Sequence, residues 1–163
     1  MSIEINRANE LAFDELTPLI AESESEGWRF VRRFADELNS GTNCFSRPGE
    51  ALFVARMGKS VVGICGINID PYASDETTGR VRRLYVLRAY RGKEIGRRLV
   101  RAVVAAAAGR FQRLRVRTEN PDAGRLYERL GFHPAAGEAE CTHVMELVGL
   151  GQSAVADRPS DLI

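Results

Sequence analysis

A glycine-containing basic segment near the middle of the chain has the composition of an anion-binding loop. Its residues are Arg91, Gly92, Lys93, Glu94, Ile95, Gly96 and Arg97. It lies between a strand-like segment and the start of an amphipathic helix, where unpaired backbone N–H groups and the helix dipole favour a phosphate. It matches neither the P-loop nor the Rossmann pattern. The segment predicts a pyrophosphate site, and a tight loop packed against the sheet is the alternative.

A second segment, from Asn120 to Phe132, combines a helix start with a tyrosine. Asn120 is a typical N-cap, and Pro121 suits the first helical position. Helical spacing places Asn120, Ala123 and Tyr127 on one face, at the C-terminal end of the preceding strand. Taken alone, this pattern favours a cap and a core tyrosine.

Together, residues 80–132 resemble the GNAT superfamily of acyl-CoA-dependent N-acetyltransferases. Its later helix reads N-x-x-A-x-x-L/F-Y-x-x-x-G-F, and the matching positions are Asn120, Ala123, Leu126, Tyr127, Gly131 and Phe132. Its pyrophosphate loop reads Q/R-x-x-G-x-G/A, which matches at Arg91 and Gly96. Glu94 stands where the family usually has glycine, so a negative side chain is placed near a negative ligand.

The resemblance implies acetyl-CoA as co-substrate, no metal, and direct attack of an amine on the thioester without a cysteine nucleophile. It implies that backbone N–H groups near Tyr85 and Val86 polarise the thioester carbonyl. The loop from Arg91 to Arg97 would hold the pyrophosphate, and Asn120 would contact the pantetheine arm. Tyr127 would protonate the departing thiolate.

The residues do not identify the general base. Many relatives have a glutamate on the strand before the loop, but residues 79–83 offer only arginines as ionisable groups. A water relay, Asp70, Glu119 and His143 are the alternatives. The expected acceptor is a primary amine of a small molecule or peptide. Two other interpretations stay open. One is a family member that binds CoA without catalysis, because of Glu94 and the missing glutamate, and the other is a nucleic-acid-binding module that uses the arginines of residues 80–117.

Charge is unevenly distributed behind a net charge of +1. Residues 1–79 sum to −6, residues 80–117 to +12 and residues 118–163 to −5. The basic block predicts an anionic ligand, although a solvated arginine-rich face would look the same. The block contains three aromatic residues and no nucleic-acid-binding motif, so no nucleic-acid partner is expected. Glu22, Glu24 and Glu26 would attract a cationic amine unless they form an ordinary solvated surface.

The order of apolar patterns predicts an α/β fold with a mostly antiparallel sheet of about six or seven strands and flanking helices. The expected strands are residues 3–5, 51–56, 60–69, 80–87, 113–118, Phe132 and 141–148. The expected helices are residues 9–22, interrupted at Thr17-Pro18 with Thr17 as a cap, 28–38, 94–108 and 121–130. Residues 80–87 and 113–118 should form a central parallel pair, because one helical crossover joins them. Residues 71–79 should be a loop, residues 1–148 a single domain and residues 149–163 a tail.

Composition excludes several other classes of protein. The longest apolar run, residues 102–108, is far shorter than the roughly 20 residues that span a bilayer, so no membrane helix is expected. Charged residues at the N-terminus do not fit a signal peptide, so we expect a cytoplasmic protein. Cys44, Cys65 and Cys141 show no disulfide or zinc pattern. A homodimer is left open.

Overall fold

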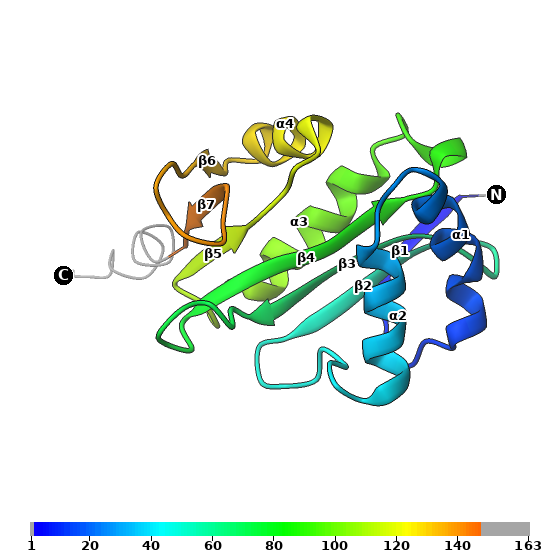
Figure 1. Cartoon of the computed structure of the whole chain (residues 1–163), viewed down its shortest axis with the longest axis horizontal. Helices are drawn as coiled ribbons and strands as arrows, with labels where there is room; N and C mark the ends of the chain where they lie inside the picture. The colour runs from blue at the N-terminus through cyan, green and yellow to red at the C-terminus, as the bar shows by residue number, and fades with distance from the viewer. Residues whose placement is uncertain (1, 148–163) are drawn as a thin grey trace.

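A mixed β-sheet forms the centre of the computed structural model, which describes residues 2–147 (Figure 1). Within these residues the sheet has seven strands in the spatial order β1-β2-β3-β4-β5-β7-β6. The strands are β1 (Ile3–Arg7), β2 (Ala51–Met57), β3 (Ser60–Ile69), β4 (Thr78–Val86), β5 (Arg113–Val116), β6 (His133–Pro134) and β7 (His143–Glu146). The helices are η1 (Phe13–Leu16), α1 (Thr17–Ser25), α2 (Phe30–Ser40), η2 (Arg88–Tyr90), α3 (Ile95–Ala107) and α4 (Pro121–Arg129).

Helices cover both faces of the sheet and enclose two apolar cores. α1 and α2 pack on one face, where Leu19, Phe34 and Ile64 are fully buried. α3 packs on the opposite face with Ile95 and Leu99, which share one side of the helix because they are four residues apart. The sheet therefore lies between two layers of helices, and its β4–β5 region borders both layers.

The two parallel strands part along their length. β4 and β5 pair from Thr78–Arg113 to Val81–Val116, and residues 82–86 of β4 continue beyond the last of these pairs. On its other side, β4 stays paired with β3 as far as Val86. The edge of β4 that faces β5 is thus open over these residues, and backbone groups there are available to a ligand.

A β-bulge interrupts β4 within the open part. The register between β3 and β4 shifts between Ile64 and Gly66, and Arg83 has φ +65°. Val81 and Leu84 both pack into the core beneath α3. Arg82 and Arg83 lie between them, so the bulge places two consecutive arginines on the opposite face, toward α2.

The predicted fold class is confirmed: the described sheet is mostly antiparallel and contains one parallel pair, β4 and β5. Asn120 caps α4, as the N-cap pattern predicts, by accepting a hydrogen bond from the backbone N–H of Asp122 at 2.9 Å. The division into a domain of residues 1–148 and a tail stays a prediction. The predicted tail, residues 149–163, lies outside the described residues.

Several predicted boundaries are wrong for identifiable reasons. Residues 71–79 were expected as a loop, but β4 begins at Thr78. Glycine suggests a turn, yet Gly79 belongs to β4. Close packing explains the glycine, because a Cβ there would come within 3.0 Å of the side chains of Leu114 and Phe111. Thr17 is the first residue of α1, and Leu16 is its N-cap.

The strands near the C-terminal end are also shorter than predicted. Phe132 precedes β6 rather than belonging to a strand, and it is buried next to Tyr127. The predicted strand 141–148 is reduced to β7, four residues long, and its last predicted residue lies outside the described part of the chain. The aromatic residue Phe132 therefore indicated a buried core position and not a paired strand.

Candidate functional site

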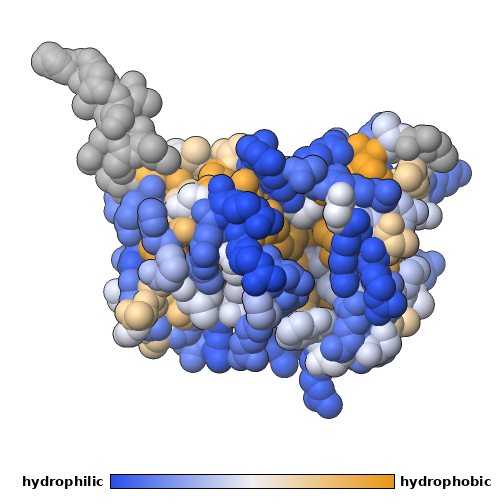
Figure 2. Space-filling view, turned by 90° about the horizontal axis from the view of Figure 1, so that it is seen from above, coloured by the Kyte–Doolittle hydropathy of each residue, from blue (hydrophilic) through white to orange (hydrophobic). Residues whose placement is uncertain are grey.

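A cleft of about 1160 Å³ opens where β4 and β5 part. It is lined by the 91–97 loop, by α4, by β4 and by the connection between α1 and α2. Figure 2 views the molecule from above and shows apolar surface set between hydrophilic side chains. The cleft brings together the loop and the α4 tyrosine, which the sequence analysis singled out separately.

The 91–97 loop presents a run of unused backbone donors. Within the described part of the chain, no N–H group from Gly92 to Arg97 donates to a protein acceptor, and the first helical bond is from Arg98 to the carbonyl of Glu94. Gly92 (φ +78°) and Glu94 (φ +67°) both have left-handed backbone conformations. Such a turn at a helix N-terminus gathers N–H groups into a concave anion site.

Glu94 lies just before α3 rather than inside it. The sequence analysis placed it at the first position of the helix, but α3 begins at Ile95 and Glu94 is the N-cap. Its left-handed conformation is costly for a residue with a Cβ, which explains why glycine is favoured at such a position. The Glu94 side chain is exposed and forms an ion pair with Arg97 at 2.9 Å.

Arg91 is fixed against the first helical layer. It donates two hydrogen bonds of 3.0 Å to Glu26 and a third, of 2.9 Å, to the carbonyl of Val86. Tyr85 also donates to Glu26 or to Glu22, each at 2.8 Å, one at a time because the hydroxyl has one proton. The hydrogen bonds from Arg91 lower the pKa of Glu26 to about 2, against the opposing effect of burial.

We expect Glu26→Gln to flatten the acid side of the stability profile. The folded pKa of Glu26 is depressed, so its contribution is complete above the unfolded value near 4.5 and is lost as pH falls toward 2. At pH 7 the variant should lose about 1 to 2 kcal/mol, an estimate that allows for solvent screening of the pair. Urea unfolding of both proteins between pH 7 and pH 2.5 checks this. Parallel profiles would contradict it.

The three glutamates expected to attract an amine do not form a free acidic surface. Glu22 accepts a hydrogen bond from the backbone N–H of Arg88 at 2.7 Å, and Glu26 is engaged by Arg91. Glu24 is bound by Arg32. Glu22 and Glu26 hold α1 and its connection to β4 and to the segment that follows it, and Glu24 links α1 to α2, so all three have structural roles.

The alternation of the β3–β4 ladder separates the two backbone donors proposed on β4. The N–H of Leu87 donates to the carbonyl of Val62, so the pair two residues back, Tyr85 and Ile64, also faces across the ladder. Val86 lies between these pairs and therefore turns its N–H away from β3, toward the cleft. The geometry favours Val86, and not Tyr85, as the donor near a bound carbonyl.

Asn120 and Tyr127 both reach the cleft, from the start and the second turn of α4. The Asn120 side-chain oxygen is used by the N-cap, and its amide NH₂ group has no hydrogen-bond partner among residues 2–147. The Tyr127 ring is 2% exposed and packs against Phe132, with ring centroids 5.4 Å apart.

The Tyr127 hydroxyl donates to no acceptor within the described residues, yet it is not among their fully buried, unpartnered atoms. The Tyr127 residue contributes to the lining of the cleft. Burial raises the pKa of Tyr127, which keeps its proton in place at neutral pH.

The candidate bases and Cys65 differ in whether they line the cleft or are buried away from it. Asp70 is fully buried between Arg80 and Arg115 and does not line the cleft, and neither does His143. Glu119 lines the cleft, with its side chain exposed. Cys65 is buried in β3, where burial raises the pKa of its thiol to about 12, so it stays protonated and is a poor nucleophile.

The part of the chain that the structure describes contains no cluster of three or more histidine, cysteine, aspartate or glutamate side chains that could hold a metal ion. None of its helices is both long and apolar enough to cross a bilayer.

The chain is similar to a known protein family and to a characterised enzyme. Residues 12–132 match the profile of the acetyltransferase (GNAT) family. An 82-residue segment is 38% identical to the N-alpha-acetyltransferase RimI of Mycobacterium tuberculosis, and this segment covers 48% of the chain and 49% of that relative. The chain therefore matches about half the length of this relative.

Solved structures match over most of the chain. A protein classed as an acetyltransferase from Exiguobacterium sp. 255-15 is 31% identical, with a TM-score of 0.79 over 94% of this chain and 99% of its own. The PaiA N-acetyltransferase of Thermoplasma acidophilum, solved with coenzyme A, has a TM-score of 0.62 at 17% identity over 90% and 99% of the two chains. This second likeness concerns the fold.

Proposed function

Since the chain belongs to the GNAT acetyltransferase family, we propose that it binds acetyl-CoA in the cleft between β4 and β5 and transfers the acetyl group to a primary amine. The observation that carries the proposal is the run of N–H groups from Gly92 to Arg97 without an acceptor in residues 2–147, beside a cleft that Tyr127 also lines. These donors fit the pyrophosphate of CoA, because backbone N–H groups at a helix start stabilise phosphate oxygens.

In the proposed reaction, acetyl-CoA supplies an activated thioester. The amine nitrogen forms a bond to the acetyl carbon as the carbon–sulfur bond breaks, so the amine loses a proton and the sulfur gains one. The Val86 N–H stabilises negative charge on the carbonyl oxygen, and a donor of this kind is worth roughly 3 to 4 kcal/mol in other acyl-transfer enzymes. Tyr127 gives its proton to the sulfur, and the Asn120 amide group holds the pantetheine arm.

Water is the proposed acceptor of the amine proton. Of the three side chains considered as bases, Glu119 is the one that lines the cleft, and it lies 3.5 Å from Arg117. It serves best as the end of a water relay.

Thermal unfolding with CoA tests the proposal. A ligand at one hundred times its Kd stabilises the native state by about 2.7 kcal/mol, which raises the Tm of a chain of this size by roughly 5 to 10 °C. Pantetheine lacks the pyrophosphate and is the matched control, for which we expect a much smaller shift. The absence of a shift at millimolar CoA would remove the basis of the proposal.

A nucleic-acid-binding function is less well supported. The arginines of the basic block that form an ion pair with a carboxylate are Arg80, Arg83, Arg88, Arg91, Arg97, Arg113, Arg115 and Arg117. Much of the block is thus neutralised within the fold, and it does not form one free basic face.

We expect Glu94→Gly to tighten CoA binding about three- to tenfold. Removal of the carboxylate ends its repulsion of the pyrophosphate and releases Arg97 from the 2.9 Å ion pair. The fold should not weaken, because glycine adopts the left-handed conformation of this position at little cost and the lost pair is exposed.

Calorimetric titration of wild type and Glu94→Gly with CoA measures the change. Glu94→Ala is the control, since it removes the charge and keeps the backbone cost of a Cβ at φ +67°. Equal affinities in all three proteins would mean that Glu94 points away from the ligand, and weaker binding by both variants would mean that Glu94 itself is used.

A further inference from the structure

The cleft is also lined by arginines from two elements, β4 and α2. The bulge in β4 places Arg82 and Arg83 on the face that carries α2, and Arg29 and Arg33 come from the start and first turns of α2. All four line the cleft. The arrangement depends on the bulge, because in a regular strand two consecutive side chains would point to opposite faces.

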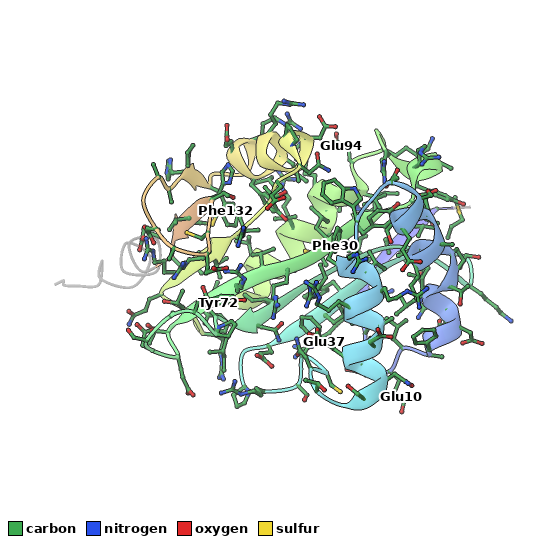
Figure 3. The ribbon with its side chains drawn as sticks, viewed as in Figure 1. Glu10, Phe30, Glu37, Tyr72, Glu94 and Phe132 are labelled. Carbon is green, nitrogen blue, oxygen red and sulfur yellow. The ribbon has the colours of Figure 1, made fainter. Side chains whose placement is uncertain are left out.

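Three of these arginines have no carboxylate partner. No ion pair within residues 2–147 involves Arg29, Arg33 or Arg82. Arg83 binds Glu37, which Figure 3 labels on α2, at 3.0 Å. Its Nε has no acceptor among the described residues, although Arg83 is only 8% exposed. A buried charged donor without a partner is costly, so it points to a group that a ligand supplies.

Carboxylates elsewhere in the cleft lining do not balance this charge. Glu26 is occupied by Arg91, and Glu140 binds Arg117 at 2.9 Å. Glu119 lies 3.5 Å from the same Arg117. An excess of positive charge therefore remains on the β4 and α2 sides of the cleft.

The arginines are close enough to repel one another. Burial lowers the pKa of Arg83, and the charges of Arg82 and Arg33 lower it further. Burial also lowers the pKa of Arg80, on the preceding outward position of the strand, and Arg82 adds to that effect. Arg80 and Arg83 each have one carboxylate partner, and Arg29, Arg33 and Arg82 have none among the described residues. The cluster therefore keeps an excess of like charge, which a bound anion would balance.

We propose that the acceptor amine carries an oxyanion, a carboxylate or a phosphate, that binds to Arg82, Arg83 and Arg33 while the amine faces the thioester. The proposal rests on the acetyl-transfer function above and names its substrate class. Guanidinium groups suit both oxyanions because they donate two parallel hydrogen bonds. A polyamine acceptor is disfavoured, because these arginines would repel its positive charges.

The same charge affects the nucleophile. An ammonium group close to arginines is disfavoured, so the bound amine is shifted toward its neutral, reactive form. The strand has arginines where a glutamate base would otherwise remove the amine proton. Electrostatic depression of the amine pKa therefore reduces the need for a strong base in this cleft.

Calorimetric titration with matched amines tests the proposal. The first pair is O-phosphoethanolamine and ethanolamine, the second is L-alanine and L-alaninamide, and spermidine is the cationic probe. We expect the member that carries the oxyanion to bind at least tenfold more tightly than the partner that lacks it, in at least one pair. Comparison of the two pairs distinguishes phosphate from carboxylate.

Variants assign the effect to the cluster. Arg82→Gln should reduce the preference to less than about threefold, and Arg33→Gln, an exposed position that does not endanger folding, should reduce it in the same direction. Arg101→Gln, exposed on α3 and outside the cleft, should leave it unchanged. Equal binding within both pairs, tighter binding of spermidine, or a preference that survives both cleft variants would overturn the proposal.

The titrations are made with and without saturating CoA, so that the two proposals fail separately. Missing CoA binding would contradict the acetyl-transfer function, while the anion preference would still be measured on the free protein. Release of CoA thiol from acetyl-CoA is then followed with the tighter-binding amine. A bound anionic amine that is not acetylated would overturn its assignment as acceptor.

Discussion

Tyr127→Phe should lower turnover by about 100- to 10,000-fold, which corresponds to roughly 3 to 5 kcal/mol of transition-state stabilisation. The substitution keeps the ring that packs against Phe132 and removes the hydroxyl alone. Since this hydroxyl has no hydrogen-bond partner in the described residues, we expect neither Tm nor CoA affinity to change much. The role left for it is proton donation to the departing sulfur.

Measurement of kcat, CoA affinity and Tm on the same variant separates this role from packing. A tyrosine whose hydroxyl satisfied a buried partner would lose around 1 kcal/mol of stability and keep its rate. Tyr85→Phe provides that comparison for stability, because the Tyr85 hydroxyl donates to Glu22 or Glu26 at 2.8 Å. A Tyr127→Phe rate within about threefold of wild type would exclude the acid role.

Much of the site was predictable because it depends on local backbone chemistry. Glycine, proline and asparagine at fixed spacing predict where α3 and α4 begin, and both helix starts lie where the sequence placed them to within one residue. The cap at Asn120 follows from the preference of a short side-chain oxygen for a free N–H. Such features need no knowledge of distant parts of the chain.

The parts that depend on tertiary contacts were not predictable. Sequence spacing does not reveal that Arg91 binds Glu26, because these residues are 65 positions apart. The β4 bulge was missed as well. Its only signal was a run of arginines in a stretch that alternation would otherwise describe as a regular strand, and this run was noted only as the absence of a glutamate.

Electrostatic assignments made from charge runs were the least reliable. The glutamates of α1 and its connection looked like a solvated acidic surface or an amine attractant, and they bind arginines and Tyr85 instead. The basic block predicted a single anion-binding site. In the fold its charges are divided between internal ion pairs, the 91–97 loop and the cleft arginines. A sum of charges along the chain does not show which of them are paired.

Gly92→Val should weaken CoA binding by about 100-fold. Gly92 has φ +78°, with open space around its Cα. The backbone conformation therefore requires glycine at this position, and steric crowding is not the reason. A β-branched residue would force the loop out of the left-handed region and turn several of its free N–H groups away from the pyrophosphate. Hydrogen bonds to charged groups contribute about 1.5 to 3 kcal/mol each, so the loss of one or two accounts for the expected change.

Gly109→Val is the matched control for this prediction. Gly109 follows the other end of α3, has φ +83° and is also surrounded by open space. Both variants should lose stability, by roughly 1 to 2 kcal/mol for a side chain in this backbone conformation. Only Gly92→Val should lose CoA affinity, because Gly109 does not line the cleft. Titration calorimetry on both variants, at a temperature where both are folded, makes the comparison. If the two bind CoA equally well, the pyrophosphate is held somewhere other than the 91–97 loop, and the unpartnered N–H groups there need another explanation.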